Sequence, residues 1–148
     1  MRRTLFRFAD AMELGMTYLL CFLLGLLFDY VNSMELDSYI LKAFFENFMD
    51  YQKLIVFLFT SIVMVFHYQM FLRKKIEIYC RMLVGDTRSS IAIRYILDCL
   101  LILGFIYFVS ILINIYMCFD LAGNLYLVLI FITYILISAS QVRKYENF

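Results

Sequence analysis

The chain has 148 residues, of which 65% are hydrophobic and 17% charged, and its mean hydropathy is +0.86. A soluble domain of this size is closer to half apolar and a quarter charged, so the composition favours an integral membrane protein. The formal net charge is only +1 and the basic residues lie beside apolar segments, which gives no support for nucleic-acid binding. The sequence contains no Ser-His-Asp set, carboxylate pair or zinc-ligand spacing, and we therefore expect no enzyme.

Four apolar stretches approach the length needed to cross the hydrocarbon core of a bilayer, which takes about 20 helical residues. Backbone N–H and C=O groups in lipid must bond within their own segment, so each stretch is predicted to be a helix. The predicted fold class is therefore all-α integral membrane, with a single domain over residues 1–148. Its four transmembrane helices are expected at about residues 14–31, 54–72, 96–117 and 125–140.

The N-terminal residues 2–13 mix apolar and charged side chains and predict an interfacial helix that leads into the first span. A basic start before an apolar stretch is also typical of a signal peptide. No small-residue cleavage site follows, and three more spans do, so we expect the first span to be retained.

The loop between the first two spans, residues 32–53, is predicted to form an amphipathic helix on the outer bilayer surface. Asn32 and Glu35 have the spacing of a capping box that would open this helix. Its apolar side chains recur every four residues, at Leu36, Ile40, Phe44 and Phe48. The sequence leaves open whether the helix only covers the outer side of the bundle or contacts a cargo or partner.

The loop between spans two and three opens with basic residues 73–75 and continues at helical spacing. Gly85 is predicted to end this short helix by adopting a positive φ. Asp86 or Thr87 can then cap a second helix, which begins near Arg88 and continues into span three. We therefore expect a short surface helix held by a glycine elbow, which can transmit force to a soluble partner.

Asp98 lies in the opening turn of span three, where an acid is costly unless it is paired or near the interface. It either benefits from the helix dipole or forms a salt bridge that locks the elbow, with Arg94, Arg73 or a neighbouring chain. The last connection, residues 120–124, is predicted to be a tight outer turn.

The basic residues are distributed unequally over the predicted loops. Three lie before span one, six between spans two and three, and two after span four, whereas only Lys42 and Lys53 lie in the outer loop. Lys and Arg beside spans are retained in the cytoplasm, so both termini and the middle loop are expected inside. We expect a multi-pass protein of the cytoplasmic membrane of a bacterium.

The middle loop carries the most specific pattern in the chain. Its basic run at residues 73–75 is followed by Glu77, then by Gly85 eight residues after that Glu, then by small, polar and basic residues 86–88, and by Asp98 at the start of span three. In this pattern and in its four-span topology the chain resembles the FtsX-like and MacB-like (type VII) permeases of ABC transporters. It differs from them in having no large extracellular domain between spans one and two, so functions of that domain are not carried over. It also has Asp86 where the family usually has a small apolar residue.

The resemblance implies that the middle loop is a coupling loop that seats on a cytoplasmic ATPase. The residues implied are Glu77, Arg81, Gly85, Asp86, Thr87 and Arg88, with Asp98 and Arg94 as the charges at the elbow and helix start. The chain has no Gly-rich phosphate loop, so ATP and magnesium would bind to a separate ATPase dimer and no cofactor to this chain. Two permease chains, either two copies or one copy and a paralogue, would then export or extract a hydrophobic or peptide-like cargo, or transmit movement across the membrane.

Other interpretations stay open at this point. A small four-span immunity or accessory protein would bind a toxin or another membrane protein without transport. A channel has less support, since the spans lack a polar stripe. The four cysteines have no metal-ligand spacing and are expected to be structural. His67 has no partner in the sequence and is expected to fill a satisfied packing or interfacial role.

Overall fold

The computed structural model describes residues 7–33, 39–119 and 124–144, with side chains up to Gln141 in the last range. These residues form five helices and no strand, which confirms the all-α class for the part of the chain described. The helices are α1 (Phe8–Ser33), α2 (Tyr39–Asp50), α3 (Gln52–Leu83), α4 (Arg88–Met117) and α5 (Leu125–Lys144).

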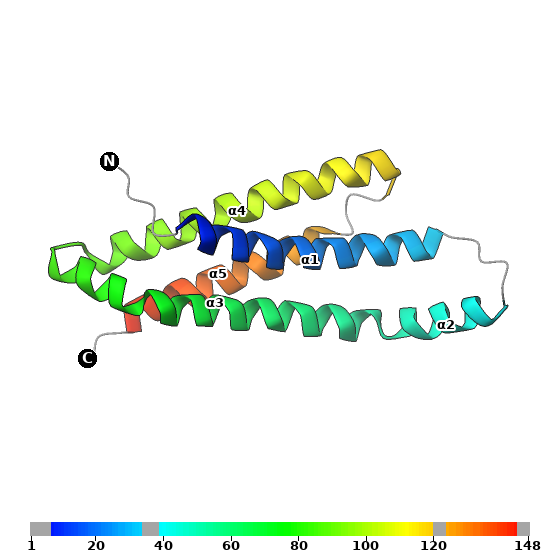
Figure 1. Ribbon diagram of the computed structural model, residues 1–148, viewed down its shortest axis with the longest axis horizontal. Helices are drawn as coiled ribbons and strands as arrows, with labels where there is room; N and C mark the ends of the chain where they lie inside the picture. Colours follow the sequence, from blue (N-terminus) through cyan, green and yellow to red (C-terminus); the bar gives the residue numbers. More distant parts are fainter. Residues whose placement is uncertain (1–6, 34–38, 120–123, 145–148) are drawn as a thin grey trace.

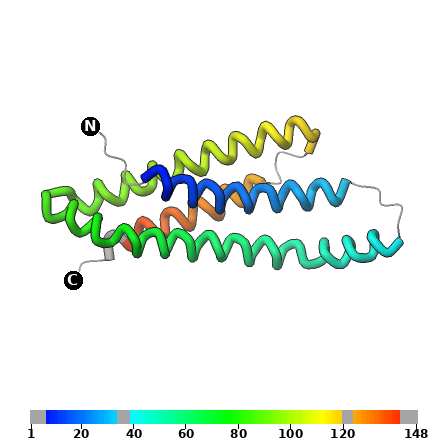
Figure 2. Tube along the Cα trace, viewed as in Figure 1, coloured from blue at the N-terminus to red at the C-terminus, as the bar shows by residue number. Residues whose placement is uncertain are grey.

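The four long helices α1, α3, α4 and α5 lie side by side, and α2 lies nearly in line with α3 (Figure 1). The start of α1, the end of α5 and the connection between α3 and α4 are all found at the same end of the bundle. At that end the α3–α4 hairpin extends past both the start of α1 and the end of α5, as the trace in Figure 2 also shows. We call the residues 84–87 that join α3 to α4 the elbow.

Three of the described helices, α1, α3 and α4, are long and apolar enough to cross a membrane. They correspond to the first three predicted spans. The apolar part of α5, Leu125–Gln141, is shorter than the 18 residues that define such a helix. The described residues thus indicate a membrane protein with three clear candidate spans.

Two sequence predictions about the ends of α1 are wrong in their boundaries. Residues from Phe8 onward belong to one uninterrupted helix that continues into the span, so they form no separate interfacial helix. Asn32 lies in the last turn of α1 and cannot open the next helix with a capping box; Glu35 and Leu36 lie outside the described residues. The physical reason is that residues 8–33 contain no proline, and their two glycines, Gly15 and Gly25, are buried where other helices pack against α1.

The amphipathic helix predicted after span one is present as α2, which begins at Tyr39. None of its residues is buried, although the Phe48 ring stacks on Phe28 of α1 with centroids 5.3 Å apart. The axis of α2 continues nearly along that of α3 (Figure 1). We had expected α2 to lie flat across the end of the bundle, on the bilayer surface.

The bundle core is built from one stripe of side chains on each long helix. On α3 the buried positions recur at intervals of three or four residues, as helix packing requires. They are Thr60, Val63, His67, Met70, Phe71, Lys74 and Ile78. Three polar side chains, Thr60, His67 and Lys74, therefore occupy buried positions on this stripe.

His67 joins three helices at the centre of this core. Its Nε2 lies 2.6 Å from the hydroxyl of Tyr18 on α1, and its Nδ1 lies 2.9 Å from the hydroxyl of Tyr95 on α4. A neutral imidazole donates from one nitrogen and accepts at the other, so one tyrosine accepts and the other donates. The imidazole is completely buried, and the expectation of a satisfied packing role is confirmed.

Replacing His67 with Leu is expected to lower the free energy of unfolding by about 1–2 kcal/mol, because the hydroxyls of Tyr18 and Tyr95 lose a buried partner. The measurement is SDS-induced unfolding in mixed micelles, followed by far-UV circular dichroism. Thr133→Val is the control, since the Thr133 hydroxyl is exposed and donates to Ile130 O in its own helix. Equal stability of the His67 variant and the wild type would contradict the role assigned to His67.

Candidate functional site

The elbow between α3 and α4 begins with a Schellman motif at the end of α3. The N–H of Gly85 donates to Met82 O at 3.1 Å, and the N–H of Asp86 donates to Arg81 O at 3.1 Å. Gly85 has φ +105°, a region in which a side chain is strained. The prediction that Gly85 ends the helix with a positive φ is confirmed.

The start of α4 is capped by Thr87. Its backbone is extended, with φ −78° and ψ 147°, and its hydroxyl accepts a hydrogen bond from the N–H of Ser90 at 3.3 Å. The helix begins at Arg88, where the sequence predicted it. Of the two residues considered for this cap, the structure therefore assigns Thr87. Asp86 has a different role, since its carboxylate lies 3.3 Å from the guanidinium of Arg94.

The expected separate surface helix between spans two and three is absent from the described chain, because residues 76–83 are the last turns of α3 itself. This corrects the prediction of a distinct coupling helix. Two features explain the continuity. The segment after Arg73 contains no helix breaker before Gly85, and the buried stripe continues through Lys74 and Ile78, so packing favours a straight helix to the elbow.

Below the elbow, an ion-pair network links α3 to the first turn of α1. The Lys74 Nζ lies 2.8 Å from the Asp10 carboxylate and 3.3 Å from that of Glu77, and only 9% of the Lys74 side chain is exposed. Glu77 in turn accepts from the Arg81 guanidinium at 2.9 Å. Two of the predicted coupling residues, Glu77 and Arg81, are thus held in a network with α1.

The charges of this network favour the ionised carboxylates. Burial raises the pKa of the Asp10 carboxyl, but hydrogen bonds from Lys74 and from the Arg7 N–H, with the positive charge of Lys74, outweigh it, and the pKa is lowered. Burial likewise raises the pKa of the Glu77 carboxyl. The hydrogen bond from Arg81 and the positive charge of Lys74 outweigh burial, so the pKa of Glu77 is lowered. The bond between Asp10 and the Arg7 N–H also caps the start of α1.

The remaining predicted site residues are divided between the elbow and the bundle. Arg94 forms a salt bridge with Asp86 at 3.3 Å. Arg73 forms one with Glu13 of α1 at 2.7 Å. The Arg94–Asp86 pair connects α4 to the elbow, whereas the salt bridge predicted for Asp98 stays a prediction. Asp98 lies one turn beyond Arg94 on α4 and is partly buried, as is Arg88 in the first turn.

The end of α3 and the first residue of the elbow carry an exposed apolar surface, which we call the tip face. It consists of Ile76, Tyr79, Cys80, Leu83 and Val84. Val84 is 90% exposed, Ile76 76% and Leu83 70%. At a rise of 1.5 Å per residue, Leu83 lies about 15 Å further along α3 than Arg73, which is more than the width of a headgroup layer. The end of the tip face therefore extends past the lipid headgroups if Arg73 lies at the edge of the hydrocarbon.

Beside the tip face is a hollow of about 540 Å³. Four of its lining residues are charged, and the others are Cys80, Val84 and Gly85. The charged ones are Glu77, Arg81, Asp86 and Arg94. The charges are arranged as two ion pairs, Glu77–Arg81 and Asp86–Arg94. An apolar surface next to paired charges of both signs is the arrangement of a protein interface with a polar rim.

Sequence reasoning did not find Asp10, Glu13 and Lys74 as parts of this site. The signal was present, because two acids three residues apart in α1 match two successive basic residues in α3. Their pairing depends on how the two helices are aligned, which the charges alone do not give. The same is true of His67, whose partners are 49 residues before it and 28 after it.

No protein-family model, no curated protein and no solved structure matches the chain. Among the described residues, no three His, Cys, Asp or Glu side chains are grouped to hold a metal ion. Over the residues that the structure describes, the chain is an all-helical protein with three candidate membrane spans and a projecting helical hairpin.

Gly85→Ala and Gly104→Ala are expected to have opposite effects on stability. Alanine at position 85 is strained at φ +105° and should lower the free energy of unfolding by about 1–2 kcal/mol. Gly104 lies inside α4 with open space around it, so alanine there should raise this free energy by about 0.5–1 kcal/mol. The comparison is made by SDS unfolding, and destabilisation of equal size at both positions would refute the assignment of Gly85.

Lys74→Met is expected to lower the free energy of unfolding at neutral pH by about 1–3 kcal/mol, because two carboxylates lose their buried partner. It should also reduce the acid sensitivity of the protein. Asp10 and Glu77 have folded-state pKa values below their usual 3.8 and 4.5, so their contribution is present above about pH 4.5 and is lost as the pH falls through the lowered values.

The measurement is a series of unfolding curves between neutral and acid pH. Lys53→Met is the matched control, because Lys53 lies at the other end of α3 and its side chain is exposed. If the Lys74 variant keeps the full wild-type loss of stability in acid, the network does not explain the pH dependence.

Proposed function

We propose that this chain is a membrane permease subunit of an ABC-type transporter, moved by a separate cytoplasmic ATPase that docks on the elbow. The single observation that carries the proposal is the exposed tip face on a hairpin that projects beyond the rest of the bundle. Leucine and valine side chains that project from the membrane into water carry an unfavourable hydration free energy. Contact with a partner protein removes their apolar surface from water. The spacing of Glu77 and Gly85, which resembles that of the type VII permeases, points to an ATPase as the partner.

The proposal includes a topology with four spans and both termini in the cytoplasm. The supporting argument is the excess of Lys and Arg in the N-terminal segment, the α3–α4 loop and the C-terminal segment. The start of α1, the elbow and the end of α5 lie at the same end of the bundle, as four crossings require. The Leu125–Gln141 part of α5 is about 25 Å long, which approaches the thickness of the hydrocarbon core.

The continuity of α3 suggests how movement of the ATPase would reach the membrane. A push at Leu83 acts on the end of a single helix that begins at Gln52, with no break to absorb it. Lys74 and Arg73 connect this helix to Asp10 and Glu13 of α1, so α1 and α3 would move together. ATP and magnesium would bind in the partner, and this chain would supply the docking surface and the moving helices. The cargo class, hydrophobic or peptide-like, rests on the resemblance alone.

Leu83→Asp combined with Val84→Asp tests the docking surface most directly. Both side chains are exposed, so the double variant should fold as the wild type does, with an unchanged SDS unfolding curve. Its association with the ATPase should weaken by at least about tenfold, because two apolar contacts are replaced by charges that must be desolvated. The measurement is copurification from the native membrane, with the ATPase rate in the same preparation. Phe8→Asp is the control, since Phe8 is 83% exposed near the same end of the bundle but outside the elbow.

Glu77 and Gly85 are less suitable for this test. Glu77 bonds Lys74 and Arg81, and Gly85 closes the end of α3, so their variants would alter the elbow itself. If no ATPase copurifies with the wild-type chain in repeated preparations, the permease proposal fails. A four-span immunity or accessory protein, which binds another protein without transport, would then be the better interpretation.

A further inference from the structure

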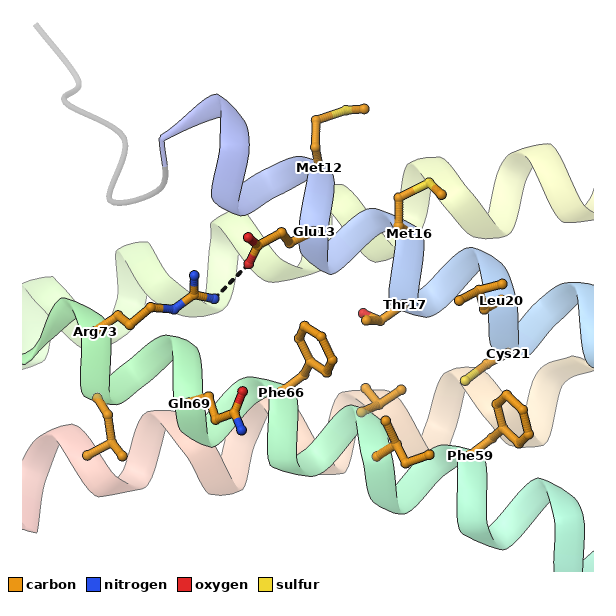
Figure 3. A pocket seen from close by; sticks show the side chains of 13 residues that line it. Met12, Glu13, Met16, Thr17, Leu20, Cys21, Phe59, Phe66, Gln69 and Arg73 are labelled. Atoms are coloured by element: carbon orange, nitrogen blue, oxygen red, sulfur yellow. Dashed lines mark hydrogen bonds and ion pairs between the residues drawn. The ribbon is translucent and has the colours of Figure 1, made fainter.

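An open groove of about 1130 Å³ runs between α1 and α3 (Figure 3). Its walls are almost entirely apolar and come from both helices, with Leu20 and Cys21 on one side and Phe59 and Phe66 on the other. None of the residues that line the groove belongs to the tip face or lines the hollow at the elbow. It is therefore a separate candidate binding site.

The groove has one polar end. Figure 3 shows the ion pair between Glu13 and Arg73 at the end nearest the elbow, with Gln69 beside it and apolar side chains beyond. The two charged groups are 2.7 Å apart, and about half of each side chain is exposed, 47% and 51%. An acid and a base are thus both accessible at the mouth of an apolar channel.

The length of the groove matches one leaflet of a bilayer. Phe59 and Arg73 are separated by fourteen residues of continuous helix, or about 21 Å, while half of a hydrocarbon core with its headgroup layer measures about 20 Å. The groove is thus long enough to take an acyl chain from the headgroup region to the middle of the bilayer.

We propose that this groove binds one phospholipid from the leaflet on the elbow side, with an amine-bearing zwitterionic headgroup of the phosphatidylethanolamine type. The lipid phosphate accepts hydrogen bonds from the Arg73 guanidinium, and the lipid ammonium donates to the Glu13 carboxylate. One of the lipid's two acyl chains lies along Phe66, Leu20 and Phe59. The flexible side chains of Met12 and Met16 at the rim can adapt to it.

The pairing of charges explains the preference for this headgroup. The Glu13 carboxylate repels an anionic headgroup, which has no positive charge to pair with it. A zwitterionic headgroup offers a phosphate to Arg73 and an ammonium to Glu13. The site does not depend on the docking of an ATPase, and it would exist equally in an accessory protein. Its test therefore uses the purified chain without a partner.

The experiment is native mass spectrometry of the full chain in mild detergent, with phosphatidylethanolamine and phosphatidylglycerol of identical acyl chains added in equal amounts. The wild type should retain one lipid per chain, with phosphatidylethanolamine preferred. Arg73→Gln should reduce its retention by about tenfold, because a charge-assisted bond to phosphate is lost. Glu13→Gln should remove the preference over phosphatidylglycerol.

Two further variants separate the headgroup contact from the groove. Leu20→Trp fills the groove and should lower the retention of both lipids, while Leu136→Trp, on an exposed position of α5, should change nothing. Glu13 and Arg73 form an exposed pair of small energetic value, so their variants are expected to remain folded.

Several lipids retained without headgroup preference, or equal retention by all variants, would overturn the proposal in favour of ordinary lipid contact. A chain dimer whose Phe59→Cys variant, with Cys21, Cys80 and Cys118 replaced by Ser, forms an intermolecular disulfide would show a second copy at the groove, and would overturn the proposal as well.

Discussion

The buried ammonium of Lys74, held between the carboxylates of Asp10 and Glu77, is the contact on which the alignment of α1 and α3 depends. A charge with this little exposure is costly unless an opposite charge is beside it. A slide of one helical turn, about 5.4 Å, would separate Lys74 from Asp10, so the pair admits one register of the two helices. The groove between α1 and α3 and the connection from α1 to the elbow both follow from that register.

Polar contacts fix the helices at further levels along the bundle. The hydrogen bonds of His67 join α1, α3 and α4, and the Asn124 amide on the N-terminal side of α5 donates to Ser110 of α4 at 3.2 Å. Gly25 of α1 lies against the same Asn124, whose Oδ1 would be only 2.9 Å from an added Cβ. In lipid, apolar side chains gain little by contacting each other instead of acyl chains, so hydrogen bonds and close approach must specify how the helices pair.

The two proposed activities use different parts of one continuous helix, α3. The tip face lies on the part of α3 that projects past the other helices, and the groove lies on the part that packs beside α1. Both parts belong to the same uninterrupted helix. Arg73 and Lys74, which pair with α1, lie where the groove ends and the projecting part begins. Movement of the tip would therefore alter the Glu13–Arg73 pair at the mouth of the groove. This would give a physical connection between the proposed partner and the proposed lipid site.

Local features of the sequence determined the helical class, the three clear spans and the form of the elbow. A glycine at positive φ and a threonine cap depend only on residues within one or two turns, which is why Gly85 and the choice between Asp86 and Thr87 could be considered from the sequence. The capping box proposed at Asn32 failed because Asn32 belongs to the last turn of α1 and does not precede a helix.

Only the tertiary structure decided which polar groups meet. Lys74 and Asp10 are 64 positions apart, and His67 and Tyr18 are 49 apart. The sequence shows that these groups must be satisfied if they are buried, but many alignments of four apolar helices are compatible with the same hydropathy pattern. The same contacts kept α3 straight to the elbow where a separate surface helix was expected. Burial of Lys74 and Ile78 continues the packing stripe past the predicted end of the span, and that burial depends on the position of α1 and the other helices.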